Sequence, residues 1–140
     1  MTYGRRMLLA AFGAALFMAP LTASAQELVL RSRLAGGAID GLVPSGHADY
    51  RQRPGEKRFS TEVEDVNLAP GTILSVFILQ DGGETRVGDL VLGPPPVRGG
   101  DLNLDTRDGQ PVPTMRPGTV VIVREPDGTA ILSGVLRRRN

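Results

Sequence analysis

The chain has 140 residues, with 16 basic and 15 acidic side chains and no cysteine. The lack of cysteine excludes disulfides, thiolate catalysis and cysteine-based metal sites. Apart from Arg5 and Arg6, arginines cluster only at residues 137–139, so the basic stripe that nucleic-acid-binding proteins place against phosphates is missing, and we expect no nucleic-acid partner.

Residues 1–25 have the pattern of a signal peptide. Arg5 and Arg6 precede an apolar run over residues 7–19, and small residues follow at 23–25, as in secretory signals. The run is shorter than the roughly 20 residues that span a bilayer, so we expect no membrane span in the mature chain. Adjacent arginines occur in general and in twin-arginine signals, and we favour the general route. We predict a secreted or periplasmic protein with one domain, residues 26–140.

The remainder of the chain predicts an all-β domain. Glycine and proline recur every few residues after the signal and leave no window for a stable helix. Short apolar and β-branched runs lie between these turn residues, which is typical of strands. In chain order, we expect strands at 27–34, 45–52, 58–66, 72–79, 84–92, 101–105, 119–124 and 129–136. We predict about eight short, mostly antiparallel strands in a two-sheet sandwich, with a small closed barrel as the alternative.

Residues 70–92 and residues 117–136 have the same sequence pattern. Each opens on Pro-Gly-Thr, turns at an Asp-Gly pair and carries a glycine, Gly88 or Gly134, in its return strand. This pattern predicts two β-hairpins, and we expect one in each half of a sandwich. The strand over 72–79 is apolar on both faces, so we expect cover on both of its sides.

One acidic stretch begins like a calcium-binding loop. Asp-x-Asn-x-Asp is the usual opening of such a loop, but Thr106 stands where the loop needs glycine and Val112 where it needs glutamate. Leucines alternate with the acids, which also indicates a half-buried strand with a polar outer face. We therefore predict no metal site. The residues kept as calcium candidates are Asp101, Asn103, Asp105 and Asp108.

No pattern in the sequence indicates catalysis. His47 is the only histidine, which excludes a site built on several histidines. Glu62 and Glu64 are two apart on a predicted strand, hence on one face and about 6.6 Å apart, but a solvated strand face explains them better than a pair of catalytic carboxylates. Nucleophile-elbow and phosphate-loop motifs are absent. We expect no enzyme activity, no catalytic residue and no cofactor.

Several segments resemble those of small exported bacterial β modules. They are GHADY (46–50), FSTEVEDV (59–66), GTILSV (71–76), VGDL (87–90), LNLDT (102–106), GQPVP (109–113) and PGT (117–119). Such modules occur singly or in tandem and have no assigned activity. The chain also resembles, more faintly, the chordin-type (CHRD) sandwich domains. Both resemblances imply a β-sandwich fold.

We expect the function to reside on a surface of this scaffold. The loops at 94–100 and 105–113 are the expected places, because loops on a rigid β framework often carry binding residues. The first hypothesis is an exported, non-enzymatic module that binds a protein or envelope component or has a structural role. The alternative is a domain that binds a small ligand or a divalent cation on its Asp101–Asp108 face. The oligomeric state stays open.

Overall fold

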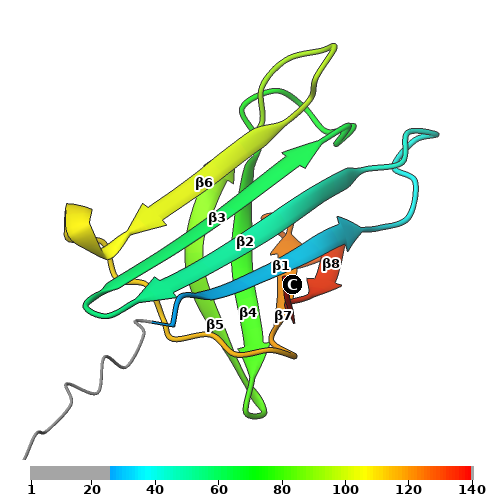
Figure 1. Ribbon diagram of the computed structural model, residues 1–140. Coiled ribbons are helices and arrows are strands. Elements are labelled where there is room, and N and C mark those ends of the chain that lie inside the picture. Colours follow the sequence, from blue (N-terminus) through cyan, green and yellow to red (C-terminus); the bar gives the residue numbers. More distant parts are fainter. Residues whose placement is uncertain (1–25, 140) are drawn as a thin grey trace, which may run out of the picture.

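The structure is a computed structural model in which residues 26–139 are described, so the predicted signal peptide lies outside the described residues. The described residues form strands joined by short loops, with one 3-10 turn and no α-helix (Figure 1). The elements are β1 (Leu28–Ala35), β2 (Ser45–Arg53), β3 (Glu56–Glu64), β4 (Ile73–Gln80), β5 (Gly83–Val91), β6 (Gly100–Asp105), η1 (Thr106–Asp108), β7 (Val120–Arg124), β8 (Ala130–Val135) and β9 (Arg137–Arg138).

All strands belong to one antiparallel sheet that curls almost into a closed barrel. Their order is β5-β4-β7-β8-β1-β2-β3-β6, and β9 continues the line of β8 along β1. The two outermost strands approach each other: the Gly93 N–H donates to the Gly99 carbonyl at 2.8 Å, and a Cβ placed on Gly88 would lie 2.9 Å from the Leu102 side chain. The all-β, antiparallel prediction is confirmed, and the small closed barrel is the arrangement that fits.

Alternating side chains fill the barrel from all sides. The register places Leu30 opposite Tyr50, Tyr50 opposite Phe59, and Phe59 opposite Leu104. The opposite wall contributes Leu74, Val76, Ile78, Leu90, Val121, Val123 and Leu132, all buried. Full burial of an aliphatic or aromatic side chain stabilises a fold by about 1.5–3 kcal/mol, so this single core explains how the domain holds together without disulfides.

The segment between η1 and β7 crosses one end of the barrel. Val112 and Met115 of this segment are buried. The Tyr50 hydroxyl donates to the Gln52 Oε1 atom at 2.7 Å and accepts from the Met115 backbone N–H, while burial raises the pKa of Tyr50. Prolines flank Val112 and cannot donate to a ladder, which explains why this segment crosses the barrel end and does not join the sheet.

The two similar hairpins are neighbours in the sheet. β4 pairs with β5, β7 pairs with β8, and β4 pairs directly with β7. The expectation that each hairpin lies in a different half of the fold is therefore wrong. Their glycines do permit close packing: Gly88 lies against Leu102, and Gly134 lies against the Arg33 backbone. Each hairpin also contains a shift in register.

The outer face of β4 is open to solvent, although its sequence predicted cover on both sides. Ile73 is 50% exposed and Leu79 is 38% exposed. Phe77, between them, is half-buried, and the Arg124 guanidinium lies 5.6 Å from its ring centre. A single sheet that closes on itself has only one interior, so no second layer covers these residues.

Candidate functional site

Three loops are linked at one end of the barrel, which we call the loop end (Figure 1). They connect β1 to β2, β3 to β4 and β5 to β6. The Asp65 N–H donates to the Val97 carbonyl at 3.0 Å. The Asn67 amide donates to the Ile39 carbonyl at 3.3 Å and its oxygen accepts from Arg98 at 2.7 Å. These bonds join all three loops into one surface.

The loop end also contains backbone in a sparsely populated conformation. Asp40, Asp65 and Arg98, one from each loop, have φ values of 47°, 57° and 47°. This left-handed region is costly for residues other than glycine, although aspartate tolerates it better than arginine. Residues held in this way cluster at sites that bind ligands or partners, so the loop end is a candidate binding surface.

Exposed hydrophobic side chains gather at the same end. Among the described residues, five large hydrophobics are exposed, and four of them lie here. The four are Val43, Ile73, Val91 and Val97, which are between 50% and 61% exposed. Ile73 pairs with Val91 across β4 and β5, and three exposed prolines lead from Val91 to Val97. We call Ile73, Val91 and residues 94–97 the apolar patch. Leu79, the fifth, lies at the other end of β4.

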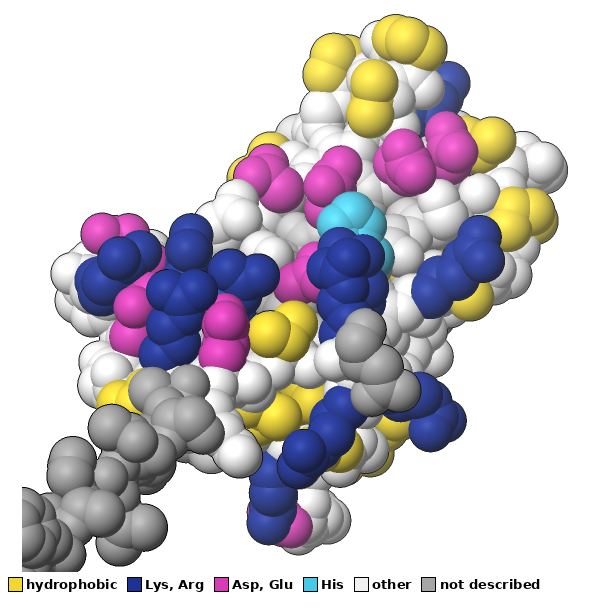
Figure 2. Space-filling view, viewed as in Figure 1, with side chains coloured by type: hydrophobic (Ala, Val, Ile, Leu, Met, Phe, Trp, Pro, Cys, Tyr) yellow, Lys and Arg dark blue, Asp and Glu magenta, His cyan; other side chains and the backbone are white. Residues whose placement is uncertain are grey.

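Acidic side chains lie next to the apolar patch. Glu62 on β3 is opposite Asp101 on β6, and the Glu64 backbone lies against Gly99 at the base of the β5–β6 loop. We call Asp40, Glu62, Glu64, Asp65 and Asp101 the acidic collar. Figure 2 shows hydrophobic side chains at the tip of the molecule with acidic side chains directly below them. The loop end therefore combines apolar contact area with negative charge.

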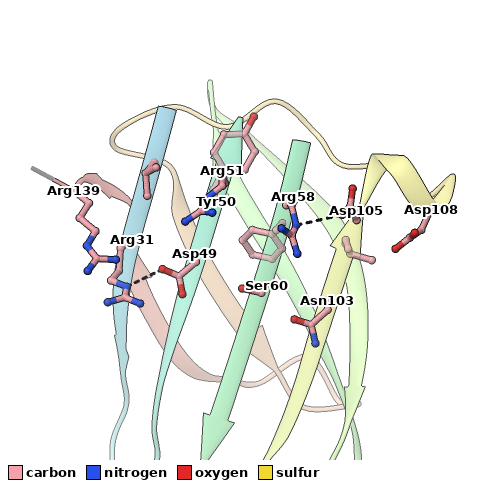
Figure 3. Close-up of a pocket in the computed structure, with 13 residues that line it drawn as sticks. Arg31, Asp49, Tyr50, Arg51, Arg58, Ser60, Asn103, Asp105, Asp108 and Arg139 are labelled. Atoms are coloured by element: carbon pink, nitrogen blue, oxygen red, sulfur yellow. Dashed lines mark hydrogen bonds and ion pairs between the residues drawn. The ribbon is translucent and has the colours of Figure 1, made fainter. Parts of the chain in front are cut away.

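The four calcium candidates do not converge on one point. Asp101 accepts from the Asn103 amide at 2.6 Å. Asp105 accepts from the Arg107 backbone N–H at 2.9 Å and lies 3.2 Å from Nε of Arg58, and Asp108 lies beyond it on η1 (Figure 3). Within residues 26–139, no group of three or more histidine, aspartate or glutamate side chains is arranged to hold a metal ion. The geometry does not favour cation binding at this face.

Two hydrogen bonds from Arg107 set the ionisation of Asp105. The Asp105 carboxylate accepts hydrogen bonds from the backbone N–H and from the guanidinium of Arg107. These bonds, the backbone bond above all, hold the pKa of Asp105 below its ordinary value of 3.8. A carboxyl group with a lowered pKa stabilises the folded state above the ordinary value, and it loses this contribution as the pH falls through the folded-state pKa.

We therefore expect Asp105→Asn to lower the stability at about pH 7, and we expect this loss to shrink as the pH falls from about 4 toward about 2 and the aspartate takes up a proton. The asparagine can still accept the backbone bond, so the change isolates the charge. Urea unfolding of both proteins across this pH range measures the difference. A difference that stays constant with pH would contradict the assigned role of the Asp105 charge.

Asn103, Asp105 and Asp108 line a groove on the outer face of β1, β2, β3 and β6, with a volume of about 380 Å³. The same groove is lined by Arg31, Arg51, Arg58 and Arg139, and we call it the arginine groove (Figure 3). Alternation along each strand is readable in the sequence, but it does not show that these arginines lie together, because they come from different strands.

His47 lies exposed on the outer face of β2. Its Nε2 atom is 3.6 Å from Glu62 and 3.9 Å from Asp49, and the three side chains are 46%, 62% and 30% exposed. Glu64 follows on the same face of β3 and is exposed as well. This arrangement is a solvated strand face.

No protein-family model and no curated protein matches this chain. Within residues 26–139 there is also no helix with the length and hydropathy to cross a membrane. Inference about function therefore rests on the geometry of the described residues.

Proposed function

We propose that the protein is an exported, non-enzymatic module that binds a protein partner at its loop end. The observation that carries this proposal is the apolar patch, bordered by the acidic collar at an end of the barrel where hydrogen bonds hold three loops together. Large exposed apolar areas bordered by polar residues often mark interaction sites. A surface that is ordered before binding also loses less conformational entropy when a partner docks.

The charges and shape of the loop end define the partner. Its complement is an apolar protein surface bordered by lysine and arginine, because opposite charges across an interface steer association and select partners. An anionic membrane surface is a poor fit, since the acidic collar would be repelled by negative headgroups. An envelope protein with a basic, apolar face fits best.

Other features support export and the absence of catalysis. Residues 1–25 have the composition of a secretory signal, and the resemblance to exported bacterial β modules agrees with this. The single histidine lies on a solvent-exposed strand face beside Glu62 and Asp49, whereas catalytic groups usually lie in a concave pocket.

A synthetic amphipathic helical peptide of leucine and lysine tests the loop end directly. We expect it to bind the protein with an affinity that falls as salt is added. Val97→Ser and Ile73→Ser should each weaken binding roughly tenfold, because each removes about 1.5 kcal/mol of apolar contact. Fluorescence anisotropy with a labelled peptide measures the effect.

Two controls make the result specific. Leu79→Ser changes an exposed hydrophobic at the other end of β4 and should leave the affinity unchanged. A peptide in which glutamate replaces every lysine should not bind. Equal affinities for all three variants, or for both peptides, would reject docking at the loop end.

A further inference from the structure

The arginine groove lies away from the apolar patch, on the outer surface of the barrel near η1. Its walls come from β1, β2, β3, β6 and the C-terminal segment, and Figure 3 shows Arg139, Arg31, Arg51 and Arg58 spread across neighbouring strands. Figure 2 shows basic side chains gathered toward this part of the molecule. No residue of the groove belongs to the apolar patch.

The register places two like charges directly opposite each other. Arg51 on β2 faces Arg58 on β3, and adjacent strands are only about 4.8 Å apart. Like charges in this position destabilise a sheet. An anion held between the two guanidinium groups would reduce this repulsion further than the carboxylates of Glu27 and Asp105 do.

The carboxylates of this face leave donors available on the arginines. Arg31 contacts Asp49 at 2.7 Å, Arg51 contacts Glu27 at 3.0 Å and Arg58 contacts Asp105 at 3.2 Å. All three contacts are made by Nε. Each guanidinium carries four further N–H donors on its terminal nitrogens, and these can fork onto a single ligand.

The surroundings add neutral hydrogen-bonding groups. Register places Ser60 opposite Asn103 and opposite Asp49, two residues along the strands from the Arg51–Arg58 pair and on the same face, and both Ser60 and Asn103 line the groove. A serine hydroxyl and an asparagine amide are donors that commonly complete a site for a tetrahedral oxyanion.

We propose that the arginine groove binds a phosphate or sulfate group, held between Arg51 and Arg58 with Arg31 and Arg139 at the sides. Arginine is the side chain best matched to such a group, because its planar fork gives two parallel hydrogen bonds to the oxygens. The residues first considered as cation ligands thus border an anion site. The group can belong to a small molecule or to a sulfated or phosphorylated polysaccharide.

The test measures the binding of inorganic phosphate, of dextran sulfate and of uncharged dextran to the protein by calorimetry. We expect Arg51→Gln/Arg58→Gln to weaken the binding of the anionic probes at least tenfold. The matched pair Arg33→Gln/Arg86→Gln removes the same charge outside the groove and should change the affinity less than twofold. Uncharged dextran should not bind.

A second variant keeps the test valid if Arg51→Gln/Arg58→Gln fails to fold. Ser60→Asp leaves every arginine in place, adds a negative charge within the groove and should abolish binding of both anionic probes. Binding of dextran sulfate alone would assign the site to a polymer, and binding of phosphate as well would show that the isolated group suffices. No binding of either probe, or equal losses in the two arginine pairs, would overturn the proposal. Peptide binding at the loop end would be unaffected by any of these results.

Discussion

Replacing Ile78 by alanine is expected to lower the free energy of unfolding by about 2–4 kcal/mol, whereas replacing Ile73 on the same strand should cost less than about 1 kcal/mol. Ile78 is 1% exposed inside the barrel, and Ile73 is 50% exposed on its outer face. Alanine at position 78 removes buried methylene groups and leaves a cavity. Urea denaturation of the two variants, which carry the same chemical change, gives the comparison.

The comparison of the two variants distinguishes a two-layer fold, in which both faces of β4 are buried, from a single curled sheet. A two-layer fold, as its sequence implied, would bury both faces of the strand, and the two variants would then lose similar stability. A single curled sheet buries only the face of Ile78. Similar losses at both positions would therefore contradict the barrel.

The second large effect is expected at Gly36. A Cβ at this position would overlap the carbonyl oxygen of Ile131 on β8, and a backbone atom cannot rotate away as a side chain can. We expect Gly36→Ala to destabilise the fold by about 3 kcal/mol or more, because the overlap must be relieved by shifting a strand. Thermal unfolding followed by circular dichroism measures the loss.

Gly37 provides the matched control for this change. A Cβ there would meet no atom within 4 Å, so Gly37→Ala should be neutral or slightly stabilising. Equal unfolding temperatures for the two alanine variants would contradict the close packing of β8 against the residue that follows β1.

Local sequence patterns were sufficient to locate the strands and their faces. Alternation within β2 and β3 separates Tyr50 and Phe59, which are buried, from His47 and Glu62, which are exposed, because side-chain direction in a strand has a fixed period of two. Turn chemistry was also readable. Pro54-Gly55 is a typical central pair of a tight turn, and Gly55 has a φ of 75°.

Local sequence patterns could not predict that the sheet closes into a barrel. Whether β4 is covered depends on where distant strands lie, and apolar residues on both faces fit a buried strand as well as a strand with an exposed binding surface. Pairing of β4 with β7 likewise joins segments about forty residues apart, and no local rule fixes such a pairing.

One part of the arginine groove was within reach of the sequence. Because Pro54 and Gly55 form a two-residue turn, the pairing of β2 with β3 is set, and it places Arg51 opposite Arg58. The sequence could not predict that Arg31 lines the groove, because a loop of nine residues separates β1 from β2 and leaves their register open.

The proposal for the loop end is tested most directly by nuclear magnetic resonance of the protein titrated with the leucine–lysine peptide. We predict that the largest shift changes occur at Ile73, Val91 and Val97, with smaller changes in the acidic collar and none at Arg51 or Arg58. Changes spread evenly over all acidic residues, or absent from the apolar patch, would contradict a partner site at this end of the barrel.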